Sequence, residues 1–567
     1  MTMNRKTWRR QQVRQRISNA PLALDDAIDV DLFAGGGGAS TGLENGLNRL
    51  IKLAINHNPK ALSMHQANHP HAFHITEDIW KVDPHLALAG RPIGWLHASP
   101  DCTHHSQAAA GQPRKQEIRS LAWIIPYWAA IGQAVVISME NVKQMQCWGP
   151  LIAKRDKTTG RVIKLVEVMA KGKTKVVRVV AEPGERVPRH QQYLVPDRKR
   201  QGQTWRQFIE ILRGFGYQVD YKCLNAADYG AATKRERLYM ICRRDGHAII
   251  WPVPSHGKDP SQASILQPHK MTADHIDWTR PCPSIFMTKE EAKAQGLNVK
   301  RPLADATLER LATGLVREVL NNPQPFIVEI ANWSRAGIHP VDQPLRTITA
   351  WPKGGSFALA APVMVQANGG FNTVPCRPVT DPCSTITASG SQQQLVEAFM
   401  VHLRRNMDAS PLSGPMPVIT ARSQHHALVE THMAEQGEYA LTPEQEADAL
   451  RVSAFLMRYY SQGGQWGKLT EPMHTITTKE RLALVTVTWQ GSTWVIVDIG
   501  LRMLTPAELY GCQGFPQDYI FDRGHDGQPL TVTDQVLMVG NSVSPPPMAA
   551  LARANNPYKL RHMREAA

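Results

Sequence analysis

Short apolar runs alternate with amphipathic stretches over the first half of the chain. The run AIDVDLF at 27–33 has the length of a buried strand, and helical patterns cover 117–133 and 203–214. Strands that alternate with helices form an open, mostly parallel sheet that binds ligands at its strand ends. We therefore predict an α/β domain over 27–250. Its further predicted strands are 52–56, 94–98, 134–138, 217–223 and 237–242.

The pattern changes at about residue 251, where prolines and short β-type runs take over. The frame P-x-x-[TV]-I-T then occurs four times, and a hydrophobic strand-like stretch precedes each copy. Such repetition predicts a β-rich second domain over 251–500, after which 501–567 returns to the first domain. The copies are QPLRTITA (343–350), DPCSTITA (381–388), GPMPVITA (414–421) and EPMHTITT (471–478).

The composition favours a polyanionic partner. Lysine and arginine total 64 against 49 acidic residues, with a sequence pI near 9.5, and neutralising phosphates releases counterions. The insertion 151–203, with 14 basic and 5 acidic residues, is either a solvated hairpin or a contact to a DNA backbone. The basic arm 1–26 is likewise either a solvated tail or a contact to phosphates.

Cysteine spacing and hydropathy indicate the compartment. The eight cysteines show no paired spacing, as in a reducing cytosol. No apolar run is long enough to cross a membrane, and the basic start lacks the apolar segment of a secretory signal. We therefore expect a cytoplasmic protein without a membrane contact.

A glycine-rich turn, DLFAGGGGA, follows the first predicted strand and opens a helix. Glycines let the backbone approach a ligand, and a helix N-terminus favours negative charge. Flavin, nicotinamide and S-adenosylmethionine sites all use such turns. Asn56 stands where an acidic residue would hold ribose hydroxyls, and Asp78 is a candidate acceptor for an adenine amino group or a turn cap. Together they favour an adenosine-bearing cofactor.

The segment HASPDCTHHSQ places Cys102 just past a predicted strand end. Zinc sites need ligand pairs with a second pair elsewhere, and no such pairs occur, so no metal site is predicted. A cysteine in a loop of small and polar residues better fits a thiolate nucleophile. Glu140 follows another strand end, where a carboxyl is a plausible proton donor beside a nucleophile. Arg235 and Arg237 alternate as a later strand begins.

The order of these motifs resembles the DNA cytosine-5 methyltransferase family. The blocks are DLFAGGGG, SPDC, ENV, RER, LTPAELYGCQGFP and GNSVSPPP. The resemblance covers 27–250 and about 501–552, and the repeats are similar to those of large prophage-type members. It implies a Rossmann-like α/β sheet that uses S-adenosylmethionine, with a β-rich target-recognition domain. It also implies double-stranded DNA as the partner, a bacterial or phage origin, and a place in DNA methylation or restriction–modification.

The resemblance further implies a role for each matched residue. Cys102 adds to carbon 6 of a flipped-out cytosine, and Glu140 holds ring nitrogen 3. Arg235 and Arg237 hold the pyrimidine oxygen and a nearby phosphate. The implied cofactor-binding residues are Phe33, Ala34, Gly35, Gly37, Asn56, His57, Asp78, Ile79, Pro100, Asn541 and Ser542.

Four positions depart from the family pattern. Asp101 and Thr103 flank the cysteine where proline and glutamine are usual, Asn56 replaces a ribose-binding glutamate, and Thr233 replaces a glutamine. Asp101 would raise the pKa of the neighbouring thiol by charge repulsion. The nucleophile, carboxyl and arginines are present, so we expect an active enzyme.

Three alternatives remain open. The first is an RNA cytosine-5 methyltransferase, against which the long repeat region argues. The second is a catalytically silent DNA-binding protein, which would tolerate loss of residues that are all present. The third is a nicotinamide- or flavin-dependent oxidoreductase that uses the glycine turn. The sequence identifies no target site and no restriction endonuclease partner.

Overall fold

The structure is a computed structural model of the 567-residue chain. Its described contacts divide the chain into two compact units. Unit 1 comprises Met1–Leu224, Glu236–Pro252 and Met548–Ala567, and unit 2 comprises Asn225–Arg235 and Val253–Pro547. The predicted domain boundaries stay predictions. The structure describes residues 24, 26–101, 120–170, 173–257, 265–277, 283–297, 301–303 and 492–559, and a few single residues up to 312. Between 326 and 489 it describes the backbone of the strands and the helical residues 447–449 and 451–452.

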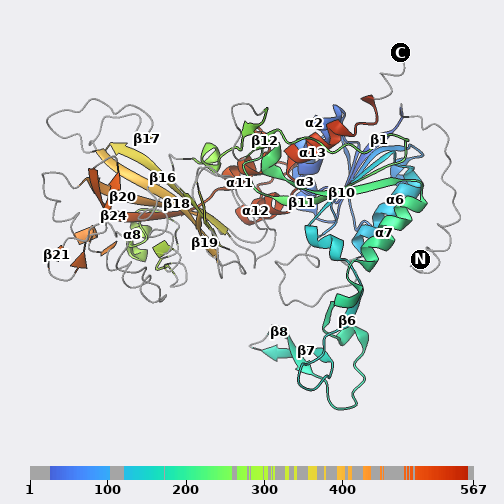
Figure 1. Cartoon of the computed structure of the whole chain (residues 1–567), viewed down its shortest axis with the longest axis horizontal. Coiled ribbons are helices and arrows are strands. Elements are labelled where there is room, and N and C mark those ends of the chain that lie inside the picture. The colour runs from blue at the N-terminus through green and yellow to red at the C-terminus, as the bar shows by residue number, and fades with distance from the viewer. Residues whose placement is uncertain are drawn as a thin grey trace. The chain divides into compact units, whose positions relative to one another are not determined.

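Unit 1 contains a sheet in which Figure 1 labels β1, β10 and β11. It has seven strands in the order β10-β11-β5-β4-β1-β2-β3. Strands β1 to β5 pair in parallel, and β11 is antiparallel to β5. The chain proceeds outward from β1 in both directions, so the order reverses between β1 and β4, which is where open α/β sheets bind ligands. The strands are β1 (Ile28–Leu32), β2 (Leu53–Asn56), β3 (Phe73–Thr76), β4 (Ile93–Ala98), β5 (Val136–Asn141), β10 (Gln218–Asn225) and β11 (Glu236–Arg243).

One face of this sheet packs against α4 (Pro84–Leu88), α6 (Ile124–Gly132) and α7 (Gln203–Gly214) in a large apolar core. Helix α7 forms because Trp205, Phe208, Ile209 and Leu212 recur at helical spacing and all four are buried. The predicted helix at 203–214 is confirmed, and α6 lies within the predicted 117–133 segment.

The other face carries α2 (Gly38–Leu47), α3 (Pro59–Asn68) and the end of α13 (Pro545–Ala554). Gly46 of α2 lies so close to α13 that an added Cβ would sit 2.5 Å from the Ala549 carbonyl oxygen. Asn556 donates to the Leu47 carbonyl oxygen, and Tyr558 donates to buried Asp29 of β1 at 2.6 Å. The last described segment of the chain is thus part of unit 1.

All six predicted strands of the first domain are confirmed. β3 was not predicted, because its exposed Phe73 and half-buried neighbours lack the continuous apolar run of a central strand. The insertion contains the hairpin of β7 (Ile163–Ala170) and β8 (Lys173–Val180), and the pair β6 (Leu151–Ala153) and β9 (Leu194–Pro196).

Unit 2 contains a second sheet whose recorded pairings are all antiparallel, so the predicted β-rich character is confirmed. Strand β14 lies in the first hydrophobic stretch that precedes a repeat, and β16 and β18 begin before the second and third stretches and overlap them. The fourth stretch and the four P-x-x-[TV]-I-T frames lie outside the described residues apart from Thr478. The order is β17-β16-β14-β19-β18-β20-β24-β23, with β15 beside β14. The strands are β14 (Phe326–Ile330), β15 (Ile338–Pro340), β16 (Ser356–Gln366), β17 (Cys376–Pro378), β18 (Gln393–His402), β19 (Met407–Ser410), β20 (His426–Glu435), β23 (Thr486–Trp489) and β24 (Ser492–Met503).

No helix in the part of the chain that the structure describes is long and apolar enough to cross a membrane.

Candidate active site

The predicted site residues of unit 1 lie along one edge of its sheet. Strands β1 to β5 run in the same direction, so their carboxyl ends meet at that edge. Phe33 follows β1, Asn56 ends β2, Asp78 follows β3, Pro100 follows β4, and Glu140 lies near the end of β5. Residues far apart in the sequence therefore lie at the same edge of the unit 1 sheet.

The glycine turn between β1 and α2 has a strongly curved backbone. Phe33, Gly35 and Gly37 have φ of 67°, 45° and 103°, which is the left-handed region that favours glycine. Ala34 donates its backbone N–H to the Ile55 carbonyl oxygen of β2, which fixes the turn over the sheet edge. Within this described segment, Gly37 supplies no side-chain cap to α2, so the helix N-terminus keeps N–H donors for a ligand.

A chain of hydrogen bonds leads from the α3–β3 region to buried Asp31 of β1. Ser40 donates to Asp31 Oδ2 at 2.7 Å, so its oxygen accepts from His65 Nε2 at 2.9 Å. His65 Nδ1 then accepts from His74 Nε2 at 2.9 Å. Burial lowers the pKa of His65 well below its ordinary value, so a neutral ring with this direction of donation is expected.

Asp31 is the terminal acceptor of this chain. Burial raises the pKa of its carboxyl to about 7, against the hydrogen bond from Ser40. Its second oxygen, Oδ1, is buried and has no hydrogen-bond partner among the described atoms. Such a buried acceptor close to the glycine turn, without a partner among the described residues, is a place where a ligand could donate a hydrogen bond.

The two polar residues expected beside a nucleoside form turns of their own. Asn56 Oδ1 accepts the backbone N–H of Asn58 at 2.8 Å, and Asp78 Oδ1 accepts that of Trp80 at 3.0 Å. The turn-cap alternative for Asp78 is thus seen in the structure, and its second carboxylate oxygen is not engaged in that bond. His57 and Asp78 are exposed, whereas Ile79 is buried.

The loop that carries the predicted nucleophile is tied to β5. Asn141 donates from Nδ2 to the Pro100 carbonyl oxygen at 2.9 Å, and both residues are buried. The same amide accepts the backbone N–H of Val142 with its oxygen. Cys102, Thr103 and the two following histidines lie outside the described residues, so the role of Cys102 stays a prediction.

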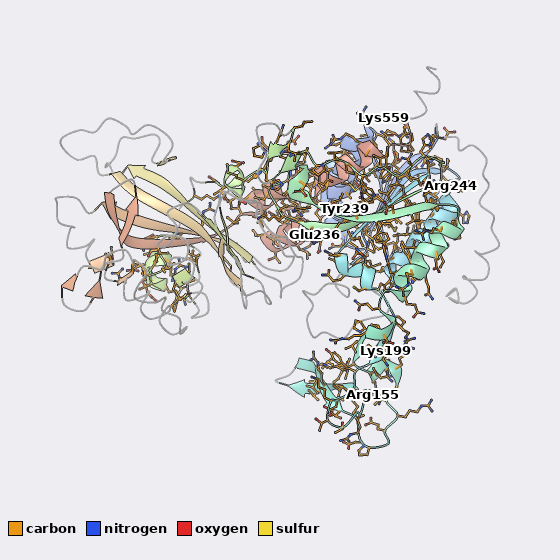
Figure 2. The ribbon with its side chains drawn as sticks, in the orientation of Figure 1. Arg155, Lys199, Glu236, Tyr239, Arg244 and Lys559 are labelled. Carbon is orange, nitrogen blue, oxygen red and sulfur yellow. The ribbon has the colours of Figure 1, made fainter. Side chains whose placement is uncertain are left out.

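Glu140 and Arg237 form a buried ion pair. Tyr239, labelled in Figure 2, lies opposite Glu140 in the antiparallel pair of β5 and β11. Arg237 is two residues away on the same face and reaches Glu140 diagonally. Arg237 Nε lies 3.2 Å from Glu140 Oε1, with side-chain exposures of 7% and 8%. Arg237 also donates to the Glu236 carbonyl oxygen at 2.9 Å, so the pair is held in one orientation.

Within unit 2, Arg235 is buried and lies beside the GNSVSPPP segment. Its Nη1 donates to the Gly540 carbonyl oxygen at 3.2 Å, near the C-terminus of α12 (Val532–Asn541), where a cation is favoured. Asn541 is exposed and Ser542 is buried, with its hydroxyl on the Val543 carbonyl oxygen. Thr233, which replaces the usual glutamine, is buried, and its hydroxyl has no partner among the described atoms.

These observations fit an adenosine-bearing cofactor at the unit 1 edge. The orphaned Asp31 Oδ1, the uncapped N-terminus of α2 and the left-handed turn offer an acceptor, N–H donors and close backbone approach. Phe33 at the turn is half-buried and offers a ring for stacking.

Sequence reasoning did not select Asp31, His97 or the holding role of Asn141. Two aspartates in the otherwise apolar IDVDL were a signal, since buried carboxyls need partners. His97 lies beside Asp31 on β4 and is joined to Ser138 at 2.8 Å. Burial lowers the pKa of His97 to about 3.

Residues 28–148 and 196–282 match the family C-5 cytosine-specific DNA methylase. The unmatched residues between these segments, 149–195, fall almost entirely in the basic insertion, and the match ends before the second sheet.

Three curated relatives are Type II methyltransferases. M.AgeI of Thalassovita gelatinovora is 22% identical over 304 residues, covering 52% of this chain and 54% of that protein. M1.HphI of Haemophilus parahaemolyticus is 44% identical over 55 residues, covering 10% and 15%. M.BsuRI of Bacillus subtilis is 34% identical over 104 residues, covering 16% and 23%. The chain spans about half the length of these relatives or less.

Two solved structures align with most of the chain. One is a putative DNA modification methyltransferase encoded within a prophage, from E. coli, with 14% identity, coverage of 94% and 99%, and a TM-score of 0.37. The other is Spodoptera frugiperda DNMT2, with 12% identity, coverage of 93% and 99%, and a TM-score of 0.39. Neither score is high enough to support a conclusion about this fold. The part of this chain that is similar to the C-5 cytosine-specific DNA methylase family, residues 28–148 and 196–282, contains the strands of the unit 1 sheet.

Proposed function

We propose that this protein methylates carbon 5 of cytosine at specific sequences in double-stranded DNA, with S-adenosylmethionine as the methyl donor. The observation that carries the proposal is the buried Glu140–Arg237 pair at the carboxyl edge of the sheet, next to the Asn141 side chain that holds the Pro100 carbonyl. The family match of the same residues supports it.

The reacting cytosine must leave the duplex, at a cost of roughly a few kcal/mol. The Cys102 thiolate then adds to carbon 6, while Glu140 donates a proton or a hydrogen bond to nitrogen 3. This addition makes carbon 5 nucleophilic enough to take an electrophilic methyl group, which S-adenosylmethionine supplies when bound. Loss of the carbon-5 proton to a base lets the thiolate leave, so the cysteine is regenerated.

The remaining residues orient these groups. Arg237 fixes the Glu140 carboxyl and offers its other guanidinium donors to the pyrimidine oxygen. Asn141 holds the start of the nucleophile loop through Pro100. Phe33 would stack on the adenine, Asp78 would accept from its amino group and Asn56 would meet the ribose, while Asn541 and Ser542 would close over the methionine end. Arg235 would contact a phosphate.

The test is Cys102→Ala, with Cys147→Ala as a matched control because Cys147 is an exposed thiol of the same domain. Cys102→Ala should abolish methyl transfer and the covalent trapping of DNA that carries 5-fluorocytosine, because it removes the attacking thiolate. Cys147→Ala should behave like the wild type in both assays. Bisulfite sequencing of DNA from cells that express each variant reads the activity and the target sequence. Methylation that persists in Cys102→Ala would contradict the mechanism.

A further inference from the structure

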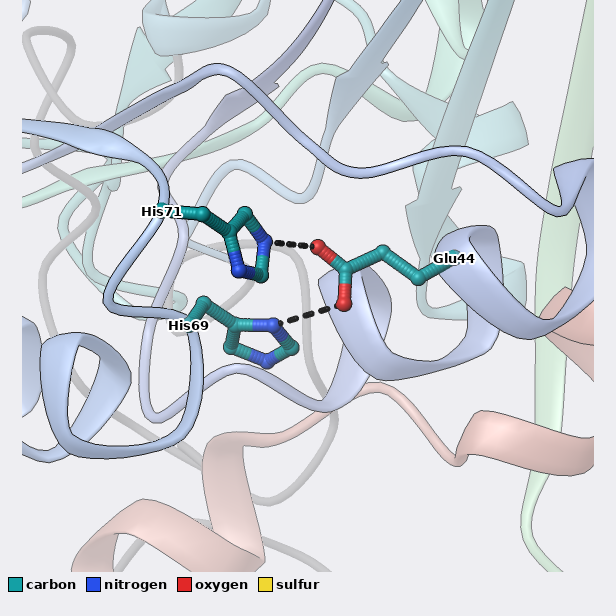
Figure 3. A group of neighbouring side chains, drawn as sticks. All are labelled: Glu44, His69 and His71. Carbon is teal, nitrogen blue, oxygen red and sulfur yellow. Dashed lines mark hydrogen bonds and ion pairs between the residues drawn. The ribbon is translucent and has the colours of Figure 1, made fainter.

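Three polar side chains outside the predicted catalytic set converge between α2 and the segment that joins α3 to β3 (Figure 3). Glu44 extends from α2, and His69 and His71 follow α3. His69 Nδ1 lies 3.0 Å from Glu44 Oε2, and His71 Nε2 lies 2.6 Å from Glu44 Oε1. One candidate ligand atom from each residue lies within 4.8 Å of the others.

The hydrogen bonds around His69 favour a positive charge, either a proton or a metal ion, between its ring and Glu44. Thr41 donates its only hydroxyl hydrogen to the Gly37 carbonyl oxygen at 2.9 Å. Its oxygen therefore accepts from His69 Nε2, which lies 3.3 Å away. A neutral ring with its hydrogen on Nε2 presents a lone pair from Nδ1 to the carboxylate, another acceptor. Either an additional proton or a metal ion must lie between them.

The dimensions and chemistry of the cluster fit the metal ion. Tetrahedral zinc binds imidazole nitrogen and carboxylate oxygen at about 2.0–2.2 Å, so its ligand atoms lie roughly 3.3 Å apart. The nitrogen–oxygen separations of 3.0 Å for His69 and 2.6 Å for His71 are hydrogen-bond distances, so side-chain rotations must open both for the ion to enter. Two imidazoles and one carboxylate are a ligand set for zinc-class ions, and Mg²⁺ or Ca²⁺ would need more oxygens.

Access and outer contacts also suit an ion. The side chains of Glu44 and His71 are 16% and 25% exposed to solvent, so an ion can enter and a water can complete the coordination. Thr41 orients His69 from the far side of its ring, and the Ile51 backbone N–H holds Glu44 Oε1 at 3.0 Å. Partners of this kind are what orient metal ligands in proteins.

We propose that Glu44, His69 and His71 bind one zinc-class metal ion. Helix α2 begins at the glycine turn and runs back along the sheet, and the histidines precede the start of β3. The ion therefore lies away from the carboxyl edge and acts structurally, by fixing α2 to the α3–β3 connection.

The experiment titrates Zn²⁺ into chelator-treated, untagged full-length protein in the Cys102→Ala background, so that the predicted nucleophile contributes no ligand. Equilibrium dialysis measures the bound zinc, and thermal unfolding measures stabilisation. The test variants are Glu44→Gln and His71→Ala. The control is His85→Ala, an exposed histidine of the same unit.

The background chain should bind one zinc ion tightly at this site. The test variants should bind zinc there with an affinity at least about tenfold lower. Zinc should raise the unfolding midpoint of the background chain and of the His85→Ala control, and should do so far less in the two test variants. The 22 histidines of the chain make weak adventitious binding common, so the difference between variants is decisive. Equal zinc binding and equal stabilisation in all variants would show that protons alone join Glu44 to the histidines, and the proposal would be wrong.

Discussion

At the scale of single residues, the site depends on buried polar side chains that pair with groups on a neighbouring strand or on the loop that follows it. Glu140 on β5 is balanced by Arg237 on β11, and Asn141 connects β5 to the loop after β4. Removing one member of a buried charged pair leaves the other uncompensated, which typically costs about 3–5 kcal/mol. Conservative substitutions therefore test these residues better than alanine.

Glu140→Gln should lower the rate of methyl transfer by about 100-fold or more, and should weaken DNA binding far less. The amide keeps the shape of the carboxyl but has no acidic proton for the ring nitrogen as charge develops there. Single-turnover kinetics and DNA-binding measurements separate the two effects. Glu236→Gln is the control, because Glu236 is half exposed and pairs with Lys143 at 3.7 Å. Equal losses of rate and binding in Glu140→Gln would assign Glu140 a structural role.

Asp31→Asn should remove a pH dependence of stability. The pKa of Asp31 is raised to about 7 in the folded state, against 3.8 for the ordinary side chain. As pH rises from about 4 to 7, the unfolded chain releases this proton first, so ionisation of Asp31 lowers the free energy of unfolding. Asparagine resembles the protonated carboxyl and lacks this penalty.

Urea unfolding without cofactor should therefore show the variant more stable than the wild type by only about 1 kcal/mol at pH 4.5. At pH 8 the variant should be more stable by on the order of 2–4 kcal/mol. Glu210→Gln, which changes an exposed carboxyl on α7, should leave the difference between pH values unchanged. A wild type and an Asp31→Asn variant with parallel pH profiles would place the Asp31 pKa in its ordinary range.

At the scale of elements, the insertion stands out because the family match skips most of it. It presents many basic side chains to solvent, including Arg155 and Lys199 beside its strands (Figure 2). Lys164 pairs with Glu185 and Arg200 pairs with Asp197, so part of the basic charge is neutralised locally. Met169 and Val176 are also 74% and 54% exposed on the hairpin. The contact to a DNA backbone therefore remains a prediction, which replacing basic side chains of the insertion by neutral ones can test.

Replacing four exposed basic residues of the insertion by glutamine should weaken DNA binding uniformly across sequences. The plot of log affinity against log salt should become shallower by about 0.9 for each DNA phosphate that the variant no longer neutralises, while the rate on saturating DNA stays the same. The residues changed are Arg186, Arg189, Arg198 and Lys199.

A charge-matched control distinguishes a local contact from a general effect of net charge. It replaces four exposed basic residues elsewhere in unit 1 and should change the salt slope much less. An identical slope for the two variants would favour the solvated hairpin. The control residues are Lys52, Lys60, Arg91 and Arg213.

At the scale of the whole molecule, the second sheet provides far more chain than the α/β core requires. Each hydrophobic stretch is separated from its repeated frame by a polar stretch, and we predict that these four stretches read base edges in the major groove. Three of them, 335–342, 371–380 and 405–413, contain the short strands β15, β17 and β19. These stretches pair back onto the strands that precede them, because antiparallel neighbours need only short connections. The fourth stretch, 464–469, lies outside the described residues.

Exchanging these four stretches, one at a time, for those of a relative with a different target should change which cytosines are methylated. Each good base contact contributes about 1–3 kcal/mol of discrimination, so transfer should continue on the new sites. Mapping methylated positions by bisulfite sequencing measures the change. If the target stays the same after all four exchanges, sequence reading must lie elsewhere, and the basic insertion becomes the first candidate.

The sequence by itself determined the local features of this protein. Apolar runs predicted most strands of the first sheet, since parallel strands buried on both faces are continuously hydrophobic. Trp205, Phe208 and Leu212 predicted α7 through their spacing. The glycine turn and the Glu140–Asn141 and Arg235–Arg237 motifs were recognisable because each needs only a few adjacent residues.

Tertiary structure alone decided which of these groups meet. The register of β5 and β11 places Tyr239 opposite Glu140, so that Arg237, almost a hundred positions after Glu140 in the chain, reaches it diagonally. Glu44 meets His69 and His71 only because α2 and the α3–β3 connection pack together, so no spacing rule for metal ligands detects them. The raised pKa of Asp31 likewise comes from burial under α2. Contacts between distant segments depend on the order and packing of the strands and helices, and local residue patterns specify neither the order nor the packing.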